Sequence, residues 1–221
     1  MESKYQGSLA ALSAANSTLK KTLNDSVAKQ NAHRLLAQKI RKSLAGAGIN
    51  AEVDPQSGEV TLHFPNEYFD YNSAEMKTGM RAQIQKLFPN YTAGLFEDKN
   101  LAEKISSVDI VGYASPTFNG HTVDPGSLTR EDQQAVNYNM DLSYRRAKSI
   151  FEYVFDTSKM QFKHQKDILK IVHVTGRSYL AEAKTQTGRT PAATSSAKEF
   201  CQVHDCQKSQ QVIIKFNLKE D

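Results

Sequence analysis

Two segments of the sequence limit the fold more than any other feature, because one has the pattern of a buried strand and the other that of an amphipathic helix. Residues 108–113 form a short apolar run, which predicts a strand inside a sheet. In residues 139–155 the apolar side chains recur every three or four positions, which is typical of a helix with one face in the core. We therefore expect an α/β domain.

The ends of these two segments are the best candidates for a functional site. Ala114 and Ser115 follow the apolar run and leave the predicted strand at its end, where loops commonly carry function. Arg146 lies on the polar side of the predicted helix. The strand end and the helix are expected to share one pocket, and the pattern indicates binding rather than catalysis.

The helix segment also matches a known pattern. Five positions fit the N-x-x-L-S-x-x-R-A pattern of the OmpA-like peptidoglycan-binding domain: Asn139, Leu142, Ser143, Arg146 and Ala147. Four other segments resemble parts of that family in the same order, namely residues 69–75, 112–115, 171–176 and 212–218. The resemblance implies an α/β sandwich with a βαβαβ core, a mixed sheet and helices on one face, here preceded by a long N-terminal helix.

The resemblance further implies that the domain binds the diaminopimelate-containing stem peptide of peptidoglycan without breaking a bond. In the family the arginine of the pattern holds a diaminopimelate carboxylate. That role falls to Arg146, and a planar guanidinium with paired donors suits a carboxylate. The rest of the implied ligand-binding pocket consists of Ala114, Ser115, Pro116, Asn139 and Leu142.

Ser115 departs from the family, which has an aspartate here to accept hydrogen bonds from the ammonium group of the ligand. Serine keeps an acceptor but loses the charge, and a charge-assisted hydrogen bond contributes about 1.5–3 kcal/mol where a neutral one contributes about 1. Weaker or altered wall binding is therefore expected. Asp109, inside the predicted strand, and Asp141, in the predicted helix, are nearby carboxylates, and neither is a good substitute.

The first part of the chain has a helical stripe of its own, made of Leu9, Leu12, Leu19, Leu23, Leu36, Ile40 and Leu44. Gly46 and Gly48 are expected to end it, so that residues 1–48 form a helical linker and residues 49–221 the OmpA-like domain. Two interpretations stay open: a partly solvated helix packed on the domain, or a linker that forms a homodimer as a short coiled coil. The combination resembles MotB-like stator subunits of ion-driven motors, in which a helical linker joins the membrane span to the OmpA-like domain.

Between these parts the sequence predicts a hairpin, a helix and two insertions. Residues 49–53 and 59–64 alternate as two strands around a turn, and residues 73–88 have the spacing of a helix that Pro89 closes. Relative to a minimal OmpA-like domain, residues 90–104 and 119–134 look inserted. The second insertion lies between the two halves of the predicted pocket, as either a solvated surface loop or a lid over the ligand.

Cys201 and Cys206 stand close together before the last predicted strand. A local disulfide is the expected state in an oxidising periplasm, and a zinc site that adds His204 is the alternative. The histidines follow no metal-binding or catalytic spacing, and no nucleophile-elbow or phosphate-loop pattern is present. We expect no cofactor, no metal and no enzymatic activity.

Composition excludes several other classes of protein. With 221 residues and 39% hydrophobic residues the chain can form a folded core. Its net charge of +4 comes from scattered lysines and arginines, so nucleic-acid binding is not expected. No stretch approaches the roughly 20 apolar residues of a membrane span, and no secretory signal is recognised. Because peptidoglycan lies outside the inner membrane, we expect a periplasmic domain whose membrane anchor precedes residue 1.

The sequence therefore predicts noncovalent anchoring to the cell wall, as the periplasmic part of a MotB-like stator subunit with an inner-membrane channel subunit as partner. The alternative is an OmpA-like protein-interaction module that has lost wall binding. The two predictions differ in their ligand, which is peptidoglycan in the first and protein in the second.

Overall fold

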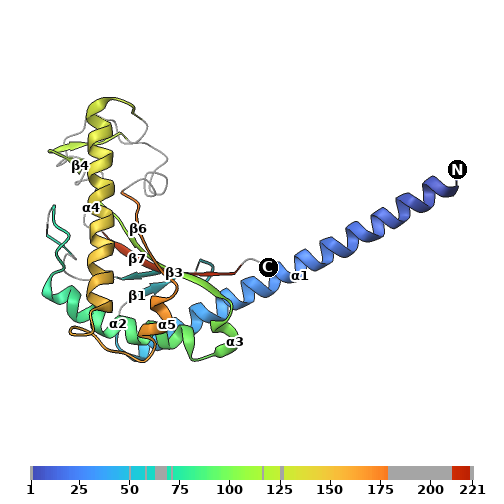
Figure 1. Cartoon of the computed structure of the whole chain (residues 1–221), viewed down its shortest axis with the longest axis horizontal. Helices are drawn as coiled ribbons and strands as arrows, with labels where there is room; N and C mark the ends of the chain where they lie inside the picture. Colours follow the sequence, from blue (N-terminus) through green and yellow to red (C-terminus); the bar gives the residue numbers. More distant parts are fainter. Residues whose placement is uncertain are drawn as a thin grey trace.

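The computed structural model describes residues 2–49, 51–57, 59–62, 69–70, 72–115, 117–124, 127–178 and 211–219. Figure 1 shows a body of strands and helices from which one long helix projects. The helices are α1 (Glu2–Gly46), α2 (Thr78–Phe96), α3 (Lys99–Ala102), α4 (Arg130–Phe155) and α5 (Gln165–Leu169). The strands are β1 (Ala51–Val53), β2 (Val60–Leu62), β3 (Ile105–Gly112), β4 (Thr117–Phe118), β5 (His121–Thr122), β6 (Val172–Gly176) and β7 (Val212–Leu218).

A five-stranded sheet forms the centre, in the order β1-β2-β7-β3-β6. β3 and β6 are parallel and are joined through α4 and α5, whereas the other neighbouring strands are antiparallel. β1 and β2 form the predicted hairpin, and the carboxylate of Asp54 in its turn accepts the backbone N–H groups of Gln56 and Ser57 at 2.6 and 2.8 Å. The predicted α/β fold, with a mixed sheet and a long N-terminal helix, is confirmed.

The core lies against one set of alternating strand residues. Val108 and Ile110 of β3 and Ile214 and Phe216 of β7 are fully buried. All five described helices bury apolar side chains in the same cluster, and α1, α2 and α4 contribute most of them, among them Leu36, Ile40, Leu87, Tyr91, Ile150 and Val154. The sheet is thus covered by helices on the face that these strand residues share.

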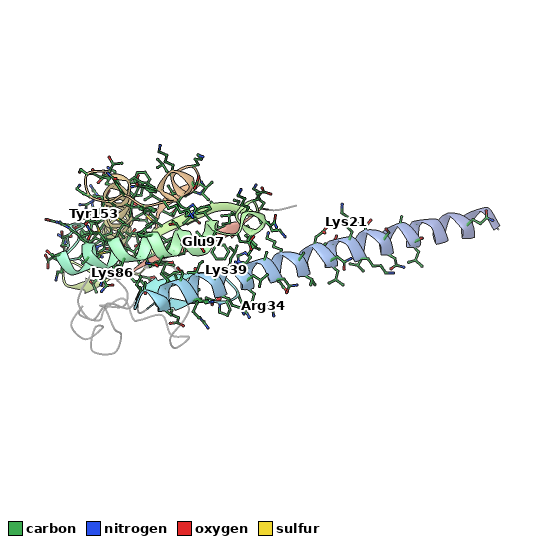
Figure 2. All side chains as sticks on the ribbon, turned by 90° about the horizontal axis from the view of Figure 1, so that it is seen from below. Lys21, Arg34, Lys39, Lys86, Glu97 and Tyr153 are labelled. Atoms are coloured by element: carbon green, nitrogen blue, oxygen red, sulfur yellow. The ribbon has the colours of Figure 1, made fainter. Side chains whose placement is uncertain are left out.

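The long helix α1 differs in its environment along its length. Its last part packs into the core through Ala32, Leu36, Ala37, Ile40 and Leu44. The earlier part extends away from the body, with Lys21 labelled on it in Figure 2, and its Leu12, Leu19, Leu23 and Val27 are 48–67% exposed. Among the helices of the described residues, none is both long and apolar enough for a membrane span. The division of the chain at residue 48 and the pairing of α1 with a second copy stay predictions.

The helix predicted to close at Pro89 continues past it, and that prediction is wrong. α2 runs from Thr78 to Phe96 with Pro89 inside it. A proline in a helix removes one backbone hydrogen bond, but Tyr91 and Leu95 beyond it are fully buried and stabilise the continuation. α2 runs beside α1 (Figure 2), and a side chain at Gly94 would come within 2.9 Å of the Ile40 backbone. Residues 90–104, predicted as an insertion, therefore comprise the end of α2, α3 and the turn before β3.

α4 crosses the sheet at two glycines that face each other in the ladder. Gly112 of β3 pairs in register with Gly176 of β6. A methyl group on Gly112 would overlap the carbonyl oxygen of Ser143 in α4, and one on Gly176 would lie 2.6 Å from the backbone nitrogen of Tyr144. The hydroxyl of Ser143 also accepts the backbone N–H of Ser178 at 2.9 Å. The helix can approach the sheet this closely only because both positions lack a side chain.

We predict that Gly112→Ala destabilises the protein by about 3 kcal/mol, because the added methyl group forces α4 away from β3. Gly79→Ala is the matched control, since nothing lies within 4 Å of a methyl group at that exposed helical position. The control should be neutral or stabilising by up to about 1 kcal/mol. Urea denaturation measures both variants, and equal stabilities would contradict the close contact of helix and sheet.

A second prediction concerns His33, where α1 meets the sheet. Its ring stacks on Phe216 with a centroid distance of 5.0 Å, and its Nδ1 is buried without a hydrogen-bond partner. Burial, with a smaller contribution from nearby Lys29, lowers the pKa of His33 below the ordinary value of 6.5. The unfolded chain therefore binds the proton first as the pH falls, so the contribution of His33 to stability is full above pH 6.5 and is lost below it.

His33→Phe should remove this part of the pH dependence while it keeps the ring stacking. Thermal unfolding of both proteins at pH 8 and pH 5.5 gives the comparison. From pH 8 to pH 5.5 we expect the melting temperature of wild type to fall further than that of His33→Phe. An equal loss would show that the pKa of His33 is not lowered in the folded protein.

Candidate functional site

A pocket of about 290 Å³ opens where the end of β3 meets the middle of α4. The described residues that line it are Asn72, Ser115, Thr117, Phe118, Asn119, Tyr138, Asn139, Leu142 and Arg146. Ser115, Asn139, Leu142 and Arg146 were all predicted from the sequence. The structure brings these four together at the strand end and the helix, as the sequence pattern indicates.

Arg146 is buried in the wall of this pocket, with an exposed fraction of 1%. Its Nε donates to the carbonyl oxygen of Ser73 at 3.0 Å, and its Nη1 to that of Tyr113 at 3.3 Å. The guanidinium carbon lies 5.1 Å from the centre of the Phe69 ring, a distance at which a cation is attracted to the ring face. Two separate segments, the chain before α2 and the end of β3, thus fix the position of one charged group.

Burial lowers the pKa of Arg146 to about 10. The side chain is still protonated at neutral pH, so the pocket carries a positive charge. A charge taken out of water is strongly unfavourable unless other groups compensate for the lost hydration. The carbonyl oxygens and the aromatic face described above supply part of that compensation.

The polar wall at the end of β3 consists of neutral groups. The hydroxyl oxygens of Ser115 and Thr117 lie 2.9 Å apart and share a hydrogen bond. Asn139 is buried, and its side-chain N–H donates to the carbonyl oxygen of Thr117 at 3.4 Å. These contacts tie the strand end to α4 and leave hydroxyl and amide groups along the pocket.

A small hairpin of β4 and β5 forms the outer wall. Asn119 and Gly120, with φ angles of +48° and +82°, make its two-residue turn, as favoured for tight hairpins. The Phe118 ring packs against that of Tyr138 in α4, with centroids 5.0 Å apart. Val123 and Ala135 form a buried cluster beside this contact. The wall is therefore held against the helix by apolar packing.

The second predicted insertion, residues 119–134, comprises part of the small hairpin and the first turn of α4. Asn119 lines the pocket, and residues 130–134 already belong to α4. Thr129 caps the helix, since its hydroxyl accepts the backbone N–H of Asp132 at 3.3 Å and donates to the Asp132 carboxylate at 2.7 Å. Hydrogen bonds from the hydroxyls of Ser127 and Thr129 lower the pKa of Asp132. The surface-loop and lid interpretations of this segment both stay predictions.

Two predicted pocket residues are not placed in the lining. Ala114 is buried next to it, and its backbone N–H donates to the carbonyl oxygen of Ser178 at 3.0 Å. Pro116 lies outside the described residues, as do Cys201 and Cys206 with their predicted disulfide. Among the described residues, no group of three His, Cys, Asp or Glu side chains is arranged to hold a metal ion.

The two carboxylates considered as replacements for the family aspartate lie elsewhere. Asp109 is within β3 and accepts hydrogen bonds from Ser107 at 3.0 Å and Asn217 at 2.9 Å. Asp141 is exposed and pairs with Arg145 at 2.8 Å, one helical turn away. Neither carboxylate lines the pocket.

Other lining residues were not predicted as part of the site: Asn72, Thr117, Phe118, Asn119 and Tyr138. The sequence does contain a signal for the outer wall, because Asn119-Gly120 is a favoured hairpin turn between short β-forming pairs. Asn72, in the segment before α2, has a positive φ of +58°. The neighbouring sequence does not predict this conformation. Only the folded chain brings this residue to the pocket.

The chain resembles OmpA-like and MotB-like domains, as the motifs predict. No family model matches the chain. In sequence it is similar to the Zorya protein ZorB of Escherichia coli (strain Crooks), with 29% identity over 140 residues. The match covers 63% of this chain, which spans only about half (54%) of ZorB.

Among solved structures, the chain is similar to a MotB-like protein from Desulfovibrio vulgaris. The match covers 86% of this chain and 94% of the other, with 14% identity and a TM-score of 0.46. At this level the likeness carries no argument about individual residues or about function.

Arg146 should stabilise the fold as well as shape the pocket. We predict that Arg146→Met costs about 2 kcal/mol, because the carbonyl oxygens of Ser73 and Tyr113 lose buried hydrogen bonds. Arg145→Met is the matched control, since the neighbouring Arg145 makes an exposed pair with Asp141. It should change stability by no more than about 0.5 kcal/mol. Chemical denaturation gives both values, and equal effects would mean that Arg146 does not join the segments around it.

Proposed function

We propose that this domain binds the stem peptide of peptidoglycan noncovalently and so anchors a membrane complex to the cell wall. In this proposal the guanidinium of Arg146 receives a carboxylate of the diaminopimelate residue. The observation that carries it is a protonated arginine in the wall of a pocket built from the residues of the OmpA-like pattern. Asn139, Leu142 and Ser115 complete the pocket around the bound group.

The geometry suits recognition of an anion. Hydrogen bonds from Nε and Nη1 hold the guanidinium plane in a fixed orientation, so little side-chain entropy remains to be lost when a ligand binds. A charge in a buried wall also acts through a lower dielectric than a charge on the surface, so its attraction for a carboxylate is stronger. Both effects favour a small anionic group over a flat protein surface.

The wider role in this proposal is that of the periplasmic part of a MotB-like stator subunit. The exposed stretch of α1 leads away from the domain, as expected for a segment that connects wall and membrane (Figure 1). Its exposed leucines would pair with those of a second copy, and an inner-membrane channel subunit would be the partner of the dimer. Similarity in sequence to ZorB supports this stator-like role.

A second candidate is a protein-interaction module that keeps the fold but not wall binding. Ser115 favours it, because the described lining contains no carboxylate to receive the ammonium group of the ligand. The module would bind the acidic side chain or carboxyl terminus of a partner protein at Arg146. The two functions are distinguished by whether purified wall competes for the pocket.

Co-sedimentation with purified diaminopimelate-type sacculi tests the proposal. Wild type should pellet with the wall, Arg146→Ala should stay in solution, and Arg146→Lys should bind weakly because an ammonium lacks the paired donors. Arg145→Ala removes the same charge from an exposed neighbouring position and should pellet like wild type. Soluble muropeptides in excess should release the wild-type protein.

Thermal unfolding of each variant separates loss of binding from loss of fold. Competition by muropeptides is read on the wild-type protein alone and does not depend on how the Arg146 variants fold. If wild type stays in solution, or if Arg145→Ala loses as much binding as Arg146→Ala, pocket-mediated wall binding is wrong.

A further inference from the structure

The single charge among the described lining residues bears on which chemical form of the ligand the pocket binds. This inference rests on the proposed function and concerns the same site. Among the described lining residues, Arg146 is the only charged one, and the others offer hydroxyl, amide or apolar groups. A ligand with one negative charge is therefore electrostatically complementary to the pocket. A ligand that also carries a positive charge finds no described carboxylate in the lining to pair with it.

Carboxylates near the pocket are engaged outside it. Asp70 pairs with Lys77 at 2.9 Å, and Glu75 pairs with Arg81 at 3.1 Å, on either side of the segment that accepts a hydrogen bond from Arg146. The Asp70 and Glu75 side chains are 73% and 81% exposed, and neither lines the pocket. They are directed to solvent and to their own cationic partners.

A free amine of the ligand would meet unfavourable surroundings here. As an ammonium group it would give up hydration, and the guanidinium of Arg146 would repel it. The hydroxyls of Ser115 and Thr117 already share one hydrogen bond, and they offer lone pairs but no charge. An amide N–H carries no charge to desolvate, and it still donates a hydrogen bond to a hydroxyl oxygen.

We propose that the pocket prefers a carboxylate whose neighbouring amine is acylated and therefore uncharged, and that it disfavours the form with a free amine. The apolar groups of the pocket fit this ligand. Leu142 and the packed rings of Phe118 and Tyr138 give a surface for the carbon atoms of an acyl group. A volume of about 290 Å³ accommodates one modified amino-acid residue.

The inferred ligand corresponds to a defined state of the wall. When two stem peptides are cross-linked through the side-chain amine of diaminopimelate, that amine becomes an amide and loses its charge. The carboxylate beside it keeps its charge. The pocket would therefore bind cross-linked stem peptides in preference to free ones. An anchor formed by this domain would then attach to the wall at its cross-links.

Three soluble peptides test this specificity: a stem tetrapeptide with meso-diaminopimelate, the same peptide with the side-chain amine acetylated, and the same peptide with the adjacent carboxylate amidated. Calorimetric titration of the full chain should show the acetylated peptide binding about tenfold tighter than the free-amine peptide. The amidated peptide should not bind measurably. Tighter or equal binding of the free-amine peptide would overturn the inference and leave the proposed function in place.

Ser115→Asp should reverse the preference, because it adds a carboxylate for the ammonium group. Ser106→Asp is the matched control: it adds the same charge at an exposed position of the same strand, outside the pocket, and should keep the wild-type preference. An unchanged preference in Ser115→Asp would also contradict the inference. If neither the peptides nor sacculi bind to wild type, the proposed function fails, and the specificity inferred from it fails with it.

Discussion

The contact between α4 and the paired strands β3 and β6 is the constraint on which the rest of the site depends. It needs two glycines opposite each other in the ladder, Gly112 and Gly176, and a small residue, Ser143, in the helix that crosses them. A closely seated helix fixes the direction of Arg146, one turn further along. The same strand continues into Ser115, so a packing requirement in the core also determines where the two sides of the pocket meet.

A buried guanidinium is an unfavourable group to place in a fold, and its surroundings explain why it is tolerated. Two carbonyl oxygens, from chain segments 40 residues apart in numbering, accept its N–H groups, and the Phe69 ring covers its face. The pocket thus offers a permanent, oriented positive charge with neutral polar groups around it. Such a site can hold an anionic ligand.

Sequence patterns predicted the parts of this fold in which apolar residues recur at the spacing of a helix or strand, and the parts that match the motif of a known family. The five strands of the central sheet, the long first helix and four lining residues of the pocket belong to this group. Pro89 was misread as the end of α2, because local propensity does not show that Tyr91 and Leu95 are buried against neighbouring helices. Asn72 and Tyr138 were not predicted as pocket residues for a related reason. They reach the pocket through tertiary packing, which no spacing pattern in the sequence predicts.

A crystal structure of the protein with a bound, side-chain-acetylated stem peptide would show whether the pocket at Arg146 binds the diaminopimelate carboxylate. We expect the diaminopimelate carboxylate to lie within hydrogen-bonding distance of the Arg146 guanidinium, between the end of β3 and α4. The acyl group should lie against Leu142 and the packed rings of Phe118 and Tyr138. A peptide bound elsewhere on the domain, or a carboxylate directed away from Arg146, would contradict it.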